Sequence, residues 1–159
     1  MAHETRVHVD ETVPAVRIER EFDAPVRDVY RAHVDPDLFA RWIGPRSLTT
    51  TVEHWDARSG GSWRFVQRRG DDVFAFWGCF HEIRENERVI MTQTYGGAPD
   101  GVLLSRMVLT PLDGDRTRLV ATATFESFAA RDAMVTSGME YGVREGYEKL
   151  DELVAAPSR

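Results

Sequence analysis

Three residues in predicted strands have side chains that commonly take part in acid–base or nucleophilic chemistry: His54, His81 and Cys79, the only cysteine. A histidine can act as a general base near neutral pH, and a cysteine becomes a nucleophile when a histidine lies beside it. Nothing in their spacing brings such partners together, and both histidines are more typical of exposed strand residues. The sequence also lacks His-x-x-x-His, His-x-His and paired cysteines. We therefore predict no catalytic residue, no metal site and no cofactor, and a non-enzymatic protein is the favoured expectation.

Polar side chains share strand faces with apolar residues at Arg20, Gln93 and Arg106. A buried arginine needs an anionic partner, which could be a ligand carboxylate or a protein carboxylate such as Glu53 or Glu82. The competing interpretation is an arginine near a strand end that reaches solvent. The pattern leaves both interpretations open.

Large aromatic residues are frequent in the central part of the chain: Trp42, Trp63, Phe65, Phe74, Phe76, Trp77, Phe80 and Tyr95. Such side chains line ligand cavities, but they also fill ordinary cores. Neighbours such as Phe76 and Trp77 point to opposite faces of a strand, so only one of them can face a cavity. The residues that we expect to bind a ligand are Trp42, Trp63, Phe65, Trp77, Met91, Gln93, Tyr95, Arg106, Met139 and Val143.

The elements that would position these residues follow from periodicity and turn signals. Residues 14–22 alternate as a half-buried strand. Two short helices follow, with start signals at Pro25 and at Asp35–Pro36. Six strands joined by short turns then occupy residues 49–125, as in an antiparallel meander. The amphipathic segment 128–155 predicts a helix that covers one face of the sheet.

This C-terminal segment carries glycines at positions 138, 142 and 146, on the face expected to meet the sheet. Each glycine lowers helix propensity by about 1 kcal/mol relative to alanine. The spacing equally favours space for a ligand and a close approach of the helix to the sheet. Ser137, with Glu140 three residues later, is a second cap signal and predicts a kink or restart within the helix.

The composition is that of an ordinary globular domain: 159 residues, 42% hydrophobic and 29% charged, with a net charge of −6. Acidic and basic residues are mixed, which argues against nucleic-acid binding. The first residues lack the apolar stretch of a signal peptide, and no segment is long and apolar enough to insert in a membrane. We expect a cytoplasmic monomer or homodimer, with residues 1–12 as an N-terminal arm, flexible or paired as a short strand, and one domain over residues 13–156.

Five stretches occur in an order that resembles a known family: Phe22–Val26 with Val29–Tyr30; Phe39–Pro45; Asp56–Trp63; Gly78 with Glu82–Ile83 and Glu87–Val89; and Ser137–Glu140 with Leu150–Leu153. Together they resemble the AHSA1-like branch (activator of Hsp90 ATPase homologue) of the SRPBCC/START/Bet v 1-like superfamily. The resemblance implies an α+β helix-grip fold. In that fold a curved, seven-stranded antiparallel sheet carries two short helices and a long C-terminal helix over a cavity.

The resemblance and the aromatic residues together predict binding of a small hydrophobic or amphipathic molecule, lipid-like or aromatic, in that cavity. One alternative is a cyclase- or dehydratase-like enzyme that uses the same cavity. Another is a stress-response protein whose partner is an Hsp90-type chaperone. Only about a dozen residues precede the predicted fold, so the additional N-terminal domain of the eukaryotic activators is not expected here.

Overall fold

The computed structural model describes residues 3–155, in which eight strands form one antiparallel sheet. The order across the sheet is β1-β2-β8-β7-β6-β5-β4-β3. The strands are β1 (Arg6–Val9), β2 (Ala15–Phe22), β3 (Thr49–Trp55), β4 (Ser62–Arg69), β5 (Asp72–Arg84), β6 (Arg88–Tyr95), β7 (Leu103–Leu112) and β8 (Arg116–Thr124). The six strands expected between residues 49 and 125 are β3 to β8.

The expected seven strands were one too few, because residues 6–9 of the predicted N-terminal arm form β1. This strand pairs with β2 in a register that places Arg6 opposite Glu19. Their side chains form an ion pair, with Arg6 Nη2 2.9 Å from Glu19 Oε1. The division into an arm of residues 1–12 and a domain of residues 13–156 stays a prediction, and its outermost residues lie outside the described part.

Two short helices connect β2 to β3: α1 (Val26–Val34) and α2 (Pro36–Trp42). The Asp35–Pro36 signal begins α2 as predicted, since the Asp35 carboxylate accepts hydrogen bonds from the backbone N–H groups of Asp37 and Leu38. Proline as the next residue costs nothing there, because the first helical N–H has no helical partner. Trp42, in the last turn of α2, is thereby held against the interior, 4% exposed.

The C-terminal segment is two helices, α3 (Phe128–Thr136) and α4 (Met139–Ala155), rather than one continuous helix. Ser127 begins α3 by accepting a hydrogen bond from the N–H of Ala130. Gly138 has φ +94°, in the left-handed region that glycine adopts without strain, and it ends α3. The restart predicted from the second cap signal is therefore a complete break between the two helices.

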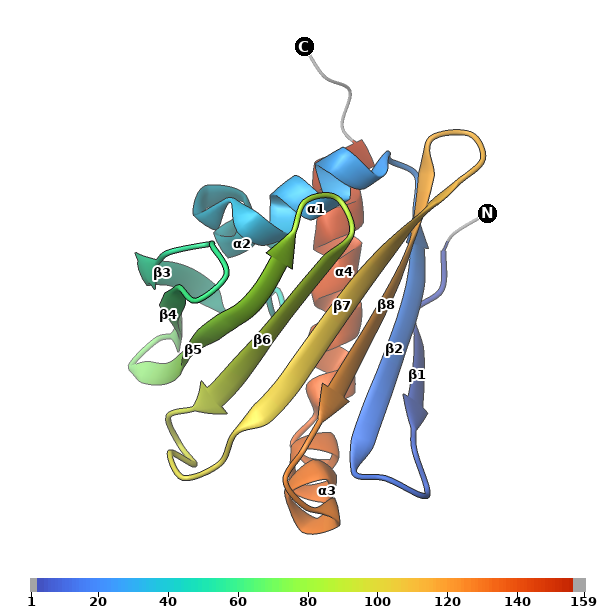
Figure 1. Ribbon diagram of the computed structural model, residues 1–159. Helices are drawn as coiled ribbons and strands as arrows, with labels where there is room; N and C mark the ends of the chain where they lie inside the picture. The colour runs from blue at the N-terminus through green and yellow to red at the C-terminus, as the bar shows by residue number, and fades with distance from the viewer. Residues whose placement is uncertain (1–2, 156–159) are drawn as a thin grey trace.

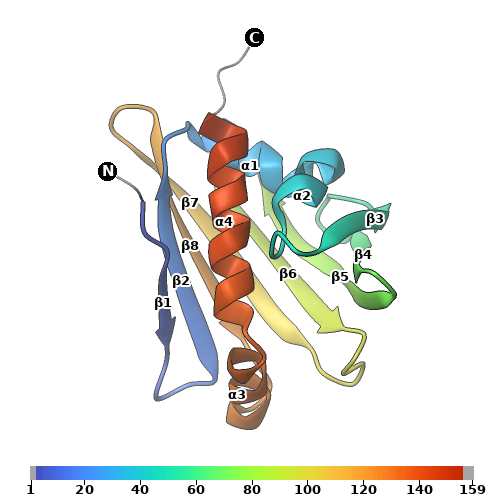
Figure 2. The same ribbon diagram turned by 180° about the vertical axis from the view of Figure 1, so that it is seen from behind.

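Helix α4 lies across the concave face of the curved sheet. Figure 1 shows the sheet in front of α4, and Figure 2 shows α4 in front of β2, β8, β7 and β6. The fully buried side chains between them include Phe22 and Leu119 from the sheet and Leu150 from α4. Register irregularities in β3 and β5 interrupt regular pairing, and such bulges increase strand bending. The helix covers the face of the sheet that α1 and α2 leave open, as expected.

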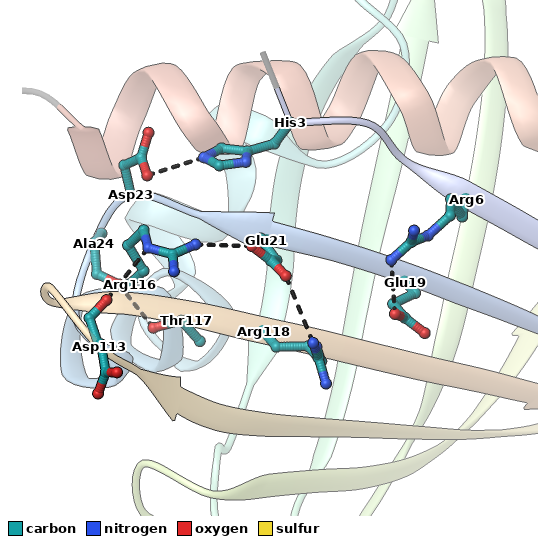
Figure 3. A network of polar contacts seen from close by, with 10 residues as sticks. All are labelled: His3, Arg6, Glu19, Glu21, Asp23, Ala24, Asp113, Arg116, Thr117 and Arg118. Atoms are coloured by element: carbon teal, nitrogen blue, oxygen red, sulfur yellow. Dashed lines mark hydrogen bonds and ion pairs between the residues drawn. The ribbon is translucent and has the colours of Figure 1, made fainter. Parts of the chain in front are cut away.

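A group of polar contacts fastens the end of β2 to its neighbours (Figure 3). Arg116 Nη1 donates to Glu21 Oε1 at 2.8 Å, and the Thr117 hydroxyl donates to the backbone oxygen of Ala24 at 2.7 Å. The Thr117 bond is fully buried and joins β8 to the segment that enters α1. These contacts fix the start of α1, which carries part of the site described next.

Candidate ligand-binding cavity

A cavity of about 310 Å³ lies between the concave face of the sheet, helices α1 and α2, and the two C-terminal helices. Its aromatic lining residues are Phe39, Trp42, Trp55, Trp63, Phe65, Phe76, Phe80, Phe125 and Tyr147. Its methionines are Met91, Met107, Met134 and Met139. The size lies at the lower end of small-molecule pockets, which are typically about 300–1,000 Å³. The lining also has their usual character, mainly apolar with a few polar groups.

One wall of the cavity consists of aromatic rings on adjacent strands. Trp63 and Phe65 alternate on β4, and their ring centroids lie 5.4 Å apart with an interplanar angle of 17°. Phe65 is paired across the strands with Phe76 on β5, where the centroids are 5.1 Å apart. The two-residue period of the strands places all three rings on one face. Together they form a row of nearly parallel rings on β4 and β5.

Seven of the ten residues expected to bind a ligand line this cavity: Trp42, Trp63, Phe65, Met91, Gln93, Met139 and Val143. They come from α2, two strands (β4 and β6) and α4, so only the folded chain brings them together. Their contact with a ligand stays a prediction.

The structure places the other three, Trp77, Tyr95 and Arg106, outside the lining. Trp77 points to the outer face of β5, because its neighbour Phe76 points inward, and the guanidinium carbon of Arg64 lies 5.2 Å from its ring centroid. Arg106 is exposed on the outer face of β7 because Met107 takes the inner one. Tyr95 packs against Phe76 in a tilted arrangement, with ring centroids 5.2 Å apart, but it is the last residue of β6 and does not line the cavity.

Sequence reasoning missed several polar lining residues, among them His33, Gln67 and Tyr147. A signal for Tyr147 existed, since it follows Val143 by four residues on α4 and so lies on the same helix face. Gln67 follows Phe65 by two residues on β4. His33 gave no comparable signal, because its position depends on how α1 packs against α2.

His33 is held in one tautomer by its own helix. Its Nδ1 lies 2.8 Å from the backbone oxygen of Val29. A carbonyl oxygen only accepts, so Nδ1 carries the proton and Nε2 of the neutral ring is an acceptor. The ring packs edge-on against Trp42 at 4.8 Å. Burial lowers the pKa of His33 to about 4, more than the bond to Val29 raises it, so the ring is neutral at physiological pH.

Tyr147, on α4, stacks on Trp42, with ring centroids 6.0 Å apart. Burial raises the pKa of its phenol well above the ordinary range, against the opposing effect of Arg20. The hydroxyl is therefore protonated and can both donate and accept. The Trp42 indole N–H already donates to the backbone oxygen of Ala32 at 2.8 Å. Trp42 thus packs against both polar rings and has no free N–H of its own.

Arg20, one of the polar residues singled out in the sequence, is buried, with 5% of its surface exposed. Its Nη1 donates to the backbone oxygen of Tyr147 at 2.9 Å, and its Nη2 lies 3.7 Å from Asp151 Oδ2. The suggested partners Glu53 and Glu82 are wrong for Arg20, because each pairs with an arginine of the adjacent strand, Glu53 with Arg64 and Glu82 with Arg88. The charge of Arg20 is therefore directed to the backbone of α4 and not to the cavity.

The three C-terminal glycines have different structural roles. Gly138 forms the turn between the helices, as described above. A Cβ on Gly146 would lie 3.2 Å from the backbone oxygen of Trp42 and 3.3 Å from the backbone nitrogen of Gly44, whereas one on Gly142 would lie 3.4 Å from Pro45 Cδ. Gly142 and Gly146 also line the cavity. Close approach of α4 to the loop after α2 therefore accounts for Gly146, and Gly142 permits a looser contact.

Residues 3–155 contain neither a candidate metal site nor a candidate membrane-spanning helix. Within that part of the chain, no group of three His, Cys, Asp or Glu side chains is placed so that it could hold a metal ion. The helices of the same residues include none that combines the length and apolar character needed to cross a bilayer.

The sheet, the gripping helix and the cavity between them define a helix-grip binding domain. The family described as "Activator of Hsp90 ATPase homolog 1-like protein" matches residues 23–155, and the chain belongs to this AHSA1 family. Membership in this family supports a binding role, for a ligand or a chaperone-type partner. No curated protein sequence matches the chain.

Solved structures of similar proteins have the same fold. A protein from Arthrobacter aurescens is 28% identical with a TM-score of 0.88, over 97% of this chain and 93% of that one. A protein from Chromobacterium violaceum is 26% identical with a TM-score of 0.80, over 90% and 99% of the respective chains. DynU16, a protein of the dynemicin biosynthetic locus, is 19% identical with a TM-score of 0.68 over 90% of this chain and 48% of its own. The last likeness is one of fold alone.

Proposed function

We propose that this protein binds a small, largely apolar molecule in the cavity between the sheet and α4. The observation that carries the proposal is the cavity itself, about 310 Å³ of space under α4 with a wall of aromatic rings and methionines. Close-packed interiors contain few voids larger than a water molecule. A void of this size forfeits packing contacts along its whole lining, and an apolar ligand restores them.

A binding role accounts for His33 better than a catalytic role does. A general base works best when its pKa lies near the operating pH. Burial lowers the pKa of His33 to about 4, so its basicity is weak at neutral pH. Its unprotonated Nε2 is nevertheless a good hydrogen-bond acceptor. The ring is therefore suited to orient a bound molecule and poorly suited to remove a proton from it.

The proposal is tested with the uncharged fluorescent probe N-phenyl-1-naphthylamine. Trp42, Trp55 and Trp63 line the cavity, so we expect saturable one-to-one binding with quenching of tryptophan fluorescence by energy transfer. In spectra of ¹⁵N-labelled protein, the amide shifts should concentrate near Trp63 and Met139.

Two neighbouring residues on β8 provide a matched pair of variants. Ala123 lines the cavity, whereas Thr124 is exposed on the opposite face of the strand. Ala123→Leu should weaken probe binding because it occupies part of the cavity, and Thr124→Leu should leave binding unchanged. Equal binding by both variants, or shifts spread over the outer face of the sheet, would contradict the proposal.

A further inference from the structure

The polar groups of the cavity restrict what kind of molecule it can hold. Among the described residues that line it, none is Asp, Glu, Lys or Arg. His33, the only histidine among them, is neutral at physiological pH because burial lowers its pKa. A charged group on a ligand would therefore lose its hydration without gaining an opposite charge. That loss is large for an isolated carboxylate or ammonium.

The nearest buried cation does not change this conclusion. The guanidinium of Arg20 donates to the backbone oxygens of Tyr147 and His3, at 2.9 and 3.2 Å, and lies near Asp151. Arg20 does not line the cavity. Although its Nε has no partner among the described residues, the guanidinium is not part of the cavity wall, so the lining supplies no counter-ion for an anion.

Three polar side chains of the lining already have protein partners. The Trp42 and Trp55 indole N–H groups donate to the backbone oxygens of Ala32 and Val34. The Gln67 amide nitrogen lies 3.2 Å from the Thr50 hydroxyl. The buried Trp63 indole N–H has no partner among the described residues. His33 is bonded only at Nδ1, so its Nε2 makes no hydrogen bond with any described residue. The wall formed by α1 therefore presents an acceptor whose missing partner is a donor.

The size of the cavity indicates the size of the occupant. An apolar cavity of about 150 Å³ binds benzene, and the cavity here, about 310 Å³, is about twice as large. The adjoining wall, Trp63, Phe65 and Phe76, is a row of nearly parallel rings. A molecule about the size of two fused rings fits these dimensions.

We infer that the occupant of the cavity is an uncharged alcohol or phenol of about two-ring size, whose hydroxyl group donates a hydrogen bond to Nε2 of His33. This inference rests on the proposed function of the cavity and adds the chemical class of its ligand. Tyr147, which packs against the same indole as His33, has a protonated hydroxyl that can donate to the oxygen of the same group. The cavity thus excludes fatty-acid-like anions, which a cavity of the same size with an unpaired arginine in its wall would accept.

The test uses three probes of nearly the same shape: 2-naphthol, naphthalene and 2-naphthoate. Their affinities are measured at neutral pH by displacement of N-phenyl-1-naphthylamine. We expect 2-naphthoate to bind at least 100-fold more weakly than 2-naphthol, because its carboxylate would be buried without a partner. In His33→Phe a buried hydroxyl loses its acceptor, so the affinity ratio of 2-naphthol to naphthalene should fall by about 5- to 100-fold.

His81→Phe is the matched control, since His81 is an exposed residue of β5 that does not line the cavity. Its affinity ratio should equal that of the unmodified protein. A second measurement uses the unmodified protein, so it is independent of how well the variant folds. In long-range ¹H–¹⁵N spectra of the imidazoles, 2-naphthol should shift the Nε2 resonance of His33, and naphthalene should not.

The outcomes separate the two proposals. Binding of 2-naphthoate at least as tight as that of 2-naphthol overturns the uncharged class while the cavity still binds ligands. An unchanged ratio in His33→Phe, or an unmoved Nε2 resonance, overturns the role of His33. If none of the three probes and not even N-phenyl-1-naphthylamine binds, the proposed function itself fails.

Discussion

Replacing Ala123 by leucine distinguishes a hollow interior from a packed one. Ala123 lies on the inner face of β8, opposite Ser105 of β7 and Val16 of β2, and lines the cavity. The change adds three carbon atoms, and burying each is worth about 0.8 kcal/mol, roughly 2.4 kcal/mol together. Restricting the new side chain costs about 0.5–1 kcal/mol. If the leucine enters empty space, the protein should become more stable by about 1.5 kcal/mol.

The same substitution at Ala32 should have the opposite effect. Ala32 is 1% exposed in α1 and does not line the cavity. Extra carbons forced into a packed position cost about 1–3 kcal/mol. The two variants share one chemical change and differ in the space available to it, so the difference in unfolding free energy between them should reach about 2.5–4.5 kcal/mol.

Urea unfolding at neutral pH measures both free energies, and thermal unfolding gives an independent value. For a protein of this size, about 1 kcal/mol corresponds to a change of about 2–4 °C in Tm. Ala123→Leu should therefore raise Tm by about 3–6 °C. If Ala123→Leu destabilises the protein as much as Ala32→Leu does, the space under α4 is already filled by side chains and the argument for a cavity is refuted.

Three further predictions concern His33, two glycines and Arg20. The unfolded chain binds a proton on His33 near its ordinary pKa of 6.5, but the folded chain does so only near pH 4. The free energy of unfolding is therefore unaffected by this group above pH 6.5 and decreases as the pH falls toward 4. Measured by urea titration across that range, the unmodified protein should lose about 1–3 kcal/mol more than His33→Phe does. Gly142→Ala should stabilise the protein by up to about 1 kcal/mol through helix propensity. Gly146→Ala should destabilise it, because the new Cβ would lie 3.2 Å from a backbone oxygen of α2. Equal Tm values for the two variants would contradict both expectations. Arg20→Met removes the buried hydrogen bonds to the backbone oxygens of Tyr147 and His3 and the ion pair with Asp151. It should lower the urea unfolding free energy by about 1–3 kcal/mol, which an unchanged midpoint would exclude.

Periodicity predicts the two faces of each strand but not which face becomes the inner one. On β6, Met91 and Gln93 were assigned to the cavity, and they line it. On β7, the face that carries Arg106 was assigned to the cavity. The residues of β7 that line the cavity, among them Met107, lie on the opposite face. Both strands have apolar residues on each face, so the alternation alone could not decide. Only the pairing across the whole sheet fixes the inner face.

The role of His33 depends on the folded structure in a way that no local pattern records. Its proton on Nδ1 follows from the helical geometry, because Val29 lies one turn before it. Its neutrality follows from burial, which requires α2 to fold back and place Trp42 against the ring. A sequence indicates that a histidine is present in a helix. It does not indicate the dielectric surroundings that determine the pKa.

The cavity, finally, has its position because α4 is held close at one end and has small or flexible residues at the other. Leu150 is fully buried in the core and does not line the cavity, whereas Met139, Gly142, Val143 and Gly146 do. The empty volume therefore lies beneath the N-terminal half of α4, between the break at Gly138 and the close contact at Gly146. A straight helix cannot follow a curved sheet over its whole length, so a tight contact at one point leaves a gap at another. Of the two roles that the glycine spacing favoured equally in the sequence, Gly142 and Gly146 do border the cavity, whereas the close approach that Gly146 permits is to the end of α2 and the loop after it and not to the sheet.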